Sequence, residues 1–141
     1  MSIAFLMAMA AASAPLSHTV SIDHGGSPLA VTYTAEVKTR MHTVSMVPPT
    51  RIGPERCRWT AVVTVERDVQ AGGKSGLNRA LPGEKEIRGD RAGNCHAGRK
   101  AIGREIEAKT ASIQSYLRQV AAEDRPALLA DIDTARALAL N

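Results

Sequence analysis

Two long stretches in which apolar and polar side chains alternate constrain this chain more than any other feature. Between positions 29 and 47 the odd-numbered residues are mostly apolar, whereas the even-numbered ones are mostly polar or charged. After Pro48 and Pro49 the odd positions are mostly apolar again, from Cys57 to Val69. Alternation with a period of two is typical of a β-strand with one buried face. The two stretches therefore predict a long antiparallel hairpin with one solvent-exposed face and one apolar face that must pack against another part of the chain.

The segments on either side of this hairpin extend the expected sheet only slightly. Residues 18–23 end at Gly25 and Gly26, a turn signal that would join them to the hairpin as a third strand. Residues 70–94 are broken by glycine and proline at short intervals, so we interpret them as a long irregular loop with room for a short strand around 85–88. The strands are therefore expected within residues 18–69.

The hydrophobic period changes to that of a helix after Asn94, which is a suitable N-cap. We expect helices across residues 95–140, divided near Pro126, which can occupy the first turn of a second helix after an Asp124 cap. A run of strands followed by a run of helices indicates the α+β class. The prediction is a single domain over residues 15–141, with a small antiparallel sheet of about three strands covered on one face by a C-terminal helical pair.

Cys57 and Cys95 are the only cysteines, and we predict that they form a disulfide. In an exported chain, an even cysteine count indicates disulfide pairing, because disulfides persist in oxidising compartments. Cys57 falls on the apolar side of its strand and Cys95 at the start of the first helix, so the bond would attach the sheet to the helices. Closing a loop of this length is worth about 4 kcal/mol by the chain-entropy estimate. The alternative is a nucleophilic Cys95 next to His96, but adjacent residues rarely face each other in regular structure.

Residues 1–14 form an uncharged apolar segment that ends in small residues and resembles a secretory signal peptide. We therefore expect this segment to be removed and the mature protein to be exported, either to a periplasm or out of the cell. No stretch is apolar over the roughly 20 residues that a transmembrane helix needs, so no membrane span is expected after signal removal. The alternative interpretation of the segment is a buried N-terminal core helix.

Positive charge is concentrated in the middle of the chain. Residues 38–104 contain 14 basic and 6 acidic residues, which gives +8, against +4 for the whole chain. We predict an anion-binding surface made of Lys38, Arg40, Arg56, Arg58, Arg88 and Arg91. A basic surface attracts anionic partners over a distance, and less strongly in salt. The expected partner is an anionic envelope component or an acidic protein. Specific nucleic-acid binding is not expected, because no aromatic residues are interleaved with the arginines.

No convincing catalytic or cofactor motif accompanies this charge. The run Gly72-Gly73-Lys74-Ser75 lacks the earlier glycine of a phosphate-binding loop, because Asp68 occupies that position. The four histidines show no metal-ligand spacing. We therefore expect no cofactor, no metal and no catalytic residue.

Three functions are compatible with these observations. The leading hypothesis is an exported, non-catalytic, envelope-associated binding or assembly module with a basic surface. The first alternative is a secreted hydrolase whose site, built from the central loop and histidines, combines His42 or His96 with Asp90 or Glu86. The second alternative is a structural protein that oligomerises through its C-terminal helices. The sequence leaves the oligomeric state open.

Overall fold

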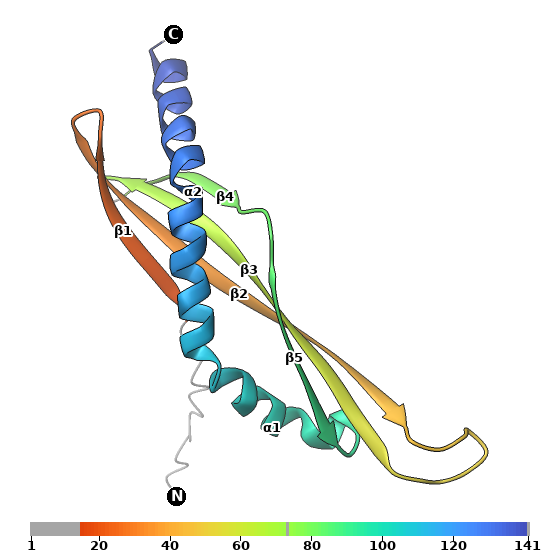
Figure 1. Cartoon of the computed structure of the whole chain (residues 1–141). Helices are drawn as coiled ribbons and strands as arrows, with labels where there is room; N and C mark the ends of the chain where they lie inside the picture. Colours follow the sequence, from red (N-terminus) through yellow and green to blue (C-terminus); the bar gives the residue numbers. More distant parts are fainter. Residues whose placement is uncertain (1–14, 73, 141) are drawn as a thin grey trace, which may run out of the picture.

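An antiparallel sheet with two helices on one of its faces forms the protein (Figure 1). The computed structural model describes residues 15–72 and 74–140, so the signal segment expected at 1–14 lies outside the described residues. The α+β class is confirmed, although the sheet has five strands where about three were expected. The elements are β1 (Ser17–His24), β2 (Ser27–Ser45), β3 (Glu55–Ala71), β4 (Lys74–Ala80), β5 (Lys85–Ala92), α1 (Cys95–Glu107) and α2 (Thr110–Ala139).

The central strand is β3, because it pairs with three other strands, all of them antiparallel. Its partner on one side is β2, in a hairpin whose register places Ser45 opposite Glu55 at the loop end. On its other side, β4 pairs with residues 66–71 and β5 pairs with residues 56–63. Strand β1 pairs with β2 and forms the opposite edge of the sheet.

The prediction of a mostly irregular loop across residues 70–94 is wrong, because β4 and β5 occupy most of this segment. The short strand expected around 85–88 lies within β5. The two strands lie end to end along β3 and together act as one interrupted edge strand. Pro82 has no backbone N–H and Gly83 has a positive φ of 91°, so the chain leaves the sheet at this point. The N–H of Leu81 donates to the carbonyl of Val65 at 2.9 Å and keeps the interruption short.

The sheet has an inner face, against which both helices pack, and an outer face that no described helix covers (Figure 1). The odd-numbered residues of the hairpin point to the inner face, as the alternation predicted. The apolar stripe of α2 packs on this face and is therefore used within the chain. Buried apolar residues of the inner face and helices include Val31, Tyr33, Ala35, Cys57, Trp59, Ala61, Val63, Val65, Val69, Ile102, Ile113, Leu117, Leu128 and Ile132.

The helices divide at a different place from the one expected. Helix α1 ends at Glu107 and α2 continues through Pro126, so the expected break near Pro126 is wrong. A proline leaves the carbonyl of residue 122 without its N–H partner, but Ala122 is exposed and water can take that place. Asp124 caps no helix, because its carboxylate binds side chains of the sheet. Asn94 caps α1 as expected. No helix among the described residues has both the length and the hydropathy of a bilayer-spanning segment.

The predicted disulfide between Cys57 and Cys95 is confirmed, with an S–S distance of 2.05 Å. It joins β3 to the first residue of α1. Cys57 belongs to a small buried cluster with Trp59, Ala61 and Ile102. The bond therefore fixes α1 beneath the half of the hairpin that is nearest the β2–β3 loop.

Candidate anion-binding site

The basic residues of the hairpin gather in cross-strand rows on the outer face. Side chains of directly paired residues point to the same side of a sheet, so the register alone defines the rows. A shallow depression of about 530 Å³ lies among them. The rows across β2, β3 and β5 are Lys38–Val62–Glu86, Arg40–Thr60–Arg88 and His42–Arg58–Asp90.

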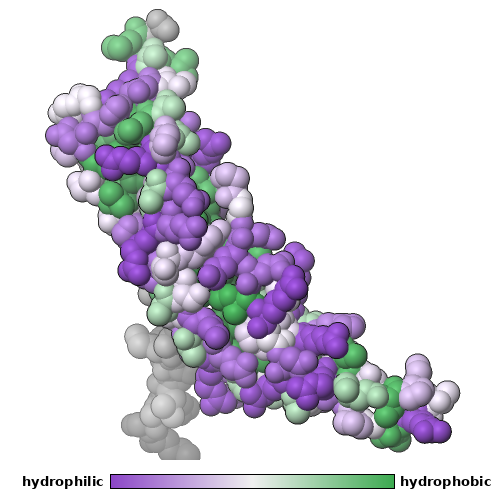
Figure 2. Space-filling model, in the orientation of Figure 1, coloured by the Kyte–Doolittle hydropathy of each residue, from purple (hydrophilic) through white to green (hydrophobic). Residues whose placement is uncertain are grey.

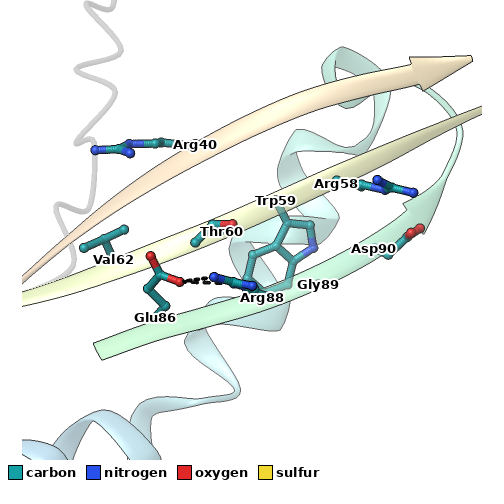
Figure 3. A pocket seen from close by; sticks show the side chains of 9 residues that line it. All are labelled: Arg40, Arg58, Trp59, Thr60, Val62, Glu86, Arg88, Gly89 and Asp90. Carbon is teal, nitrogen blue, oxygen red and sulfur yellow. Dashed lines mark hydrogen bonds and ion pairs between the residues drawn. The ribbon is translucent and has the colours of Figure 1, made fainter. Parts of the chain in front are cut away.

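Figure 3 shows how the side chains around this depression lie. Arg40 comes from β2, Arg58 from β3 and Arg88 from β5, so three neighbouring strands each contribute one guanidinium. The ring of Trp59 lies between β3 and β5, next to Gly89 on the paired strand. A Cβ at position 89 would lie 2.2 Å from this ring, so only glycine leaves room for it. The depression therefore rests on a tightly packed part of the sheet.

Several acidic side chains on the outer face neutralise a neighbouring base. These ion pairs are exposed, so each contributes little stability and can rearrange toward a ligand. Arg40 and Arg58 differ, because neither forms an ion pair with any residue in 15–72 or 74–140. The outer-face pairs are Arg88 with Glu86 at 2.5 Å, Arg56 with Asp90 at 2.6 Å and Lys38 with Glu36 at 3.4 Å.

The structure separates one residue of the predicted anion-binding surface from the others. Arg91 is paired with Cys57 across β5 and β3 and so points to the inner side of the sheet. There its Nη1 donates to Oε1 of Glu105 in α1 at 2.9 Å. Positions 88 and 91 differ in parity, a sequence signal that the prediction did not use. The residues that lie together on the outer face are Lys38, Arg40, Arg56, Arg58 and Arg88.

The residues of the alternative hydrolase site are not brought together. His42 and Asp90 lie on β2 and β5, with Arg58 of β3 between them. His96 lies in α1, on the inner side of the sheet, and Glu86 is already paired with an arginine. Within the described part of the chain, no group of three or more His, Cys, Asp or Glu side chains is placed to hold a metal ion.

A buried ion-pair network between the sheet and α2 was missed by the sequence analysis. Arg67 is 1% exposed on the inner face, and its Nη1 donates to both carboxylate oxygens of Asp124, at 2.9 and 2.7 Å. Its Nη2 donates to Asp131 at 2.5 Å, and Arg79 donates to the same oxygen of Asp131 at 2.9 Å. Tyr33 lies directly opposite Arg67 in the register, and its hydroxyl donates to Asp124 at 3.0 Å. The network therefore joins β2, β3, β4 and α2.

The protonation states of this network follow from its contacts. Burial lowers the pKa of Arg67, but the hydrogen bonds to Asp124 and Asp131 outweigh burial and hold the pKa above its ordinary value. Burial, then the hydrogen bond to Asp124, raise the pKa of Tyr33 well above its ordinary value, so the phenol remains a donor. Hydrogen bonds from Arg67 and Arg79 lower the pKa of Asp131. Two cations and two anions balance, so the network anchors α2 and offers no excess charge to a ligand.

Two signals in the sequence point to this network in retrospect. Arg67 stands at an odd position between Val65 and Val69, so the alternation itself places a charged side chain on the inner face. Asp124 and Asp131 are seven residues apart, which places both on one face of a helix. A buried charge must be paired, so an inward arginine requires carboxylates on the covering helix.

Comparison with known proteins finds no matching family model, no matching curated protein and no matching solved structure. The function must therefore be argued from the side chains of this chain and their geometry.

Proposed function

We propose that this protein is an exported, non-catalytic binding module of the cell envelope that holds an anionic component on the outer face of its sheet. The observation that carries the proposal is the pair of exposed arginines, Arg40 and Arg58, which have no carboxylate partner among residues 15–72 and 74–140. A guanidinium presents a planar set of N–H donors that matches the oxygens of phosphate and carboxylate groups.

The surroundings of Arg40 and Arg58 favour an anion as well. The outer-face set Lys38, Arg40, Arg56, Arg58 and Arg88 carries +5, and the paired carboxylates Glu36, Glu86 and Asp90 carry −3, which leaves +2. Successive rows on one face of a strand are about 7 Å apart, and neighbouring strands about 4.8 Å apart. Guanidinium and ammonium groups at these spacings suit a partner that carries several anionic groups at regular intervals. The attraction weakens as salt screens the charges.

Two features support export and a role in binding. The Cys57–Cys95 disulfide is of the kind that persists in oxidising compartments, and residues 1–14 resemble a signal peptide. At the depression, Glu86 and Asp90 each hold an arginine. A carboxylate that is paired with a guanidinium is a weaker base than a free one, which favours binding over general-base catalysis at this site.

The proposal is tested by retention of the oxidised protein on immobilised polyphosphate at low ionic strength. The variant Arg40→Gln/Arg58→Gln removes both unpaired guanidinium groups and is expected to weaken binding about tenfold or more, with a shallower salt dependence. The matched control is Arg99→Gln/Lys100→Gln, which removes the same charge from exposed positions of α1. We expect the control to change binding by less than about twofold, because long-range charge alone acts weakly.

Two results would count against the proposal. If the wild-type protein is not retained at low ionic strength, the outer face does not bind polyanions. If the control variant loses as much binding as the outer-face variant, net charge governs retention and the outer face is not a site. Circular dichroism of both variants checks that neither has lost its fold.

A further inference from the structure

The β2–β3 loop exposes apolar side chains at one end of the molecule. Met46 is 57% exposed and Ile52 is 107% exposed, and the loop between them contains no acidic residue. Figure 1 shows this loop projecting beyond both helices, and Figure 2 shows hydrophobic residues at the same end of the surface. The exposed apolar groups therefore stand at a tip, where they do not cover any other part of the chain.

The loop is closed and packed, so it holds this shape without a partner. The N–H of Met46 donates to the carbonyl of Pro54 at 3.0 Å across the base of the loop. Gly53 lies so close to Val47 that a Cβ at position 53 would be 2.6 Å from the Val47 side chain. Prolines at positions 48, 49 and 54 restrict the backbone further. A preorganised loop loses little conformational entropy when its tip binds another surface.

A basic collar adjoins this apolar tip. Arg51 lies within the loop, and Arg56 and Arg58 follow Pro54 by two and four residues. Strand geometry places these two residues about 7 and 13 Å from the loop end. The headgroup region of one bilayer leaflet is about 5–8 Å thick. Met46 is level with Pro54, so when Met46 reaches the acyl boundary Arg56 is at the depth of the phosphate groups. The long side chain of Arg51, in the turn beyond them, can extend back to the same depth.

We infer that the β2–β3 loop inserts into the interface of an anionic phospholipid bilayer, with Met46 and Ile52 at the acyl boundary and Arg51 and Arg56 at the lipid phosphates. Apolar side chains at a tip combined with neighbouring arginines match such an interface in both polarity and charge. This inference goes beyond the proposed function, because Arg51 and Arg56 of the loop end would contact the lipid phosphates, whereas Arg40 and Arg58 lie farther along the hairpin.

A bilayer suits this tip better than a protein partner does. A stable protein interface buries about 800 Å² on each partner. The tip is convex and carries only two exposed large apolar side chains, Met46 and Ile52, among the described residues. A fluid interface can surround a convex tip from all sides, whereas a protein surface would have to supply a matching groove.

The test is co-sedimentation of the full oxidised chain with vesicles of phosphatidylglycerol and phosphatidylcholine in equal parts. The variant Met46→Ser/Ile52→Ser is expected to weaken the partition coefficient about tenfold or more, because each apolar side chain that leaves water contributes to insertion. The control is Leu138→Ser/Leu140→Ser, which removes two exposed apolar side chains at the end of α2. The control should bind within about twofold of the wild-type protein, and Ile52→Trp should show a blue-shifted emission on these vesicles.

The outcomes separate this inference from the proposed function. Binding to polyphosphate without binding to vesicles overturns the inference and leaves the proposed function intact. Vesicle binding that survives the tip variant, or that is equally strong on pure phosphatidylcholine, also overturns it. If light scattering shows that the tip variant abolishes self-association instead, the loop contacts a second copy of the chain and the inference is wrong. Failure to bind either polyphosphate or vesicles overturns both proposals.

Discussion

Replacement of Asp124 by alanine is expected to destabilise the protein severely, because it leaves a buried guanidinium without its main partner. The side chain of Asp124 is 8% exposed and that of Arg67 is 1% exposed. The change removes two hydrogen bonds from Arg67 and the one from Tyr33. Removing one member of a buried ion pair costs about 3–5 kcal/mol, and Arg67 keeps its bond to Asp131, so we expect a loss of about 3–4 kcal/mol.

Urea unfolding of the oxidised protein measures this loss. Trp59 is the only tryptophan and is 3% exposed, so its fluorescence reports the unfolding of the inner face. Glu123→Ala is the matched control, because Glu123 is the exposed neighbour of Asp124 on α2, and its loss should stay within about 0.5 kcal/mol. Domains of this size are stable by only about 5–15 kcal/mol, so the unfolding of Asp124→Ala is best followed near the temperature of maximum stability, about 10–20 °C.

A second variant tests whether the unpaired charge of Arg67 causes the destabilisation. Arg67→Met/Asp124→Leu removes both charges, so it should cost less than Asp124→Ala alone although it alters more atoms. If Asp124→Ala lowers the free energy of unfolding by less than about 1 kcal/mol, the reasoning is refuted, because Arg67 would then not be a buried charge without a partner. An equal or larger loss in the double variant would refute it as well, since packing would then dominate.

Three further outcomes are expected from unfolding experiments, two with urea and one with acid. Reduction of the disulfide should lower the free energy of unfolding by about 4 kcal/mol, because it opens a loop of 38 residues, as urea curves with and without reductant would show. Gly89→Ala should cost about 1–3 kcal/mol and shift the emission of Trp59, whereas Gly103→Ala, in open space within α1, should stabilise by up to about 1 kcal/mol. The pKa of Asp131 is lowered in the folded state, so its contribution to the free energy of unfolding is complete above the ordinary value of 3.8. This contribution is lost as the pH falls through the folded-state pKa. Asp131→Asn should therefore flatten that part of the acid-unfolding curve.

The hairpin, the disulfide and the helical cover could be predicted because burial enforces a local pattern. Val31 and Val63 are completely buried, and a shift of either strand by one residue would turn its whole apolar set toward water. The same alternation places Cys57 on the inner face, next to α1. Alternation of apolar and polar residues therefore predicts the buried face of a strand reliably wherever that face packs against a helix.

Strand β4 and the full length of β5 could not be predicted in this way. Strands β4 and β5 are defined by backbone pairing with β3, and most β5 side chains are exposed, so little burial pattern is imposed on them. The glycines and Pro82 that suggested a loop mark only the interruption between the two strands and the turns at their ends. Backbone pairing with a distant segment imposes only a weak pattern of polar and apolar residues on the sequence.

The position of the helix break also depended on tertiary contacts. Pro126 and Asp124 together resemble a helix start, yet Leu117 and Leu128 on either side are both buried against the sheet. A continuous α2 keeps both leucines on the inner face and lets Asp124 reach Arg67. The gain from these contacts exceeds the loss of one helical hydrogen bond at the proline.

The disulfide lies in the smaller of the two described core clusters, and this placement connects it to binding. The described core divides into a large cluster beneath α2 and a smaller one beneath α1, which comprises Cys57, Trp59, Ala61 and Ile102. Full burial of a large apolar side chain contributes about 1.5–3 kcal/mol, so the smaller cluster alone holds α1 weakly. The depression between Arg40 and Arg88 and the β2–β3 loop both belong to this half of the hairpin. A covalent bond at this point keeps the arginine rows and the loop on a rigid support, so reduction is expected to disturb the binding half before it disturbs the contacts of α2.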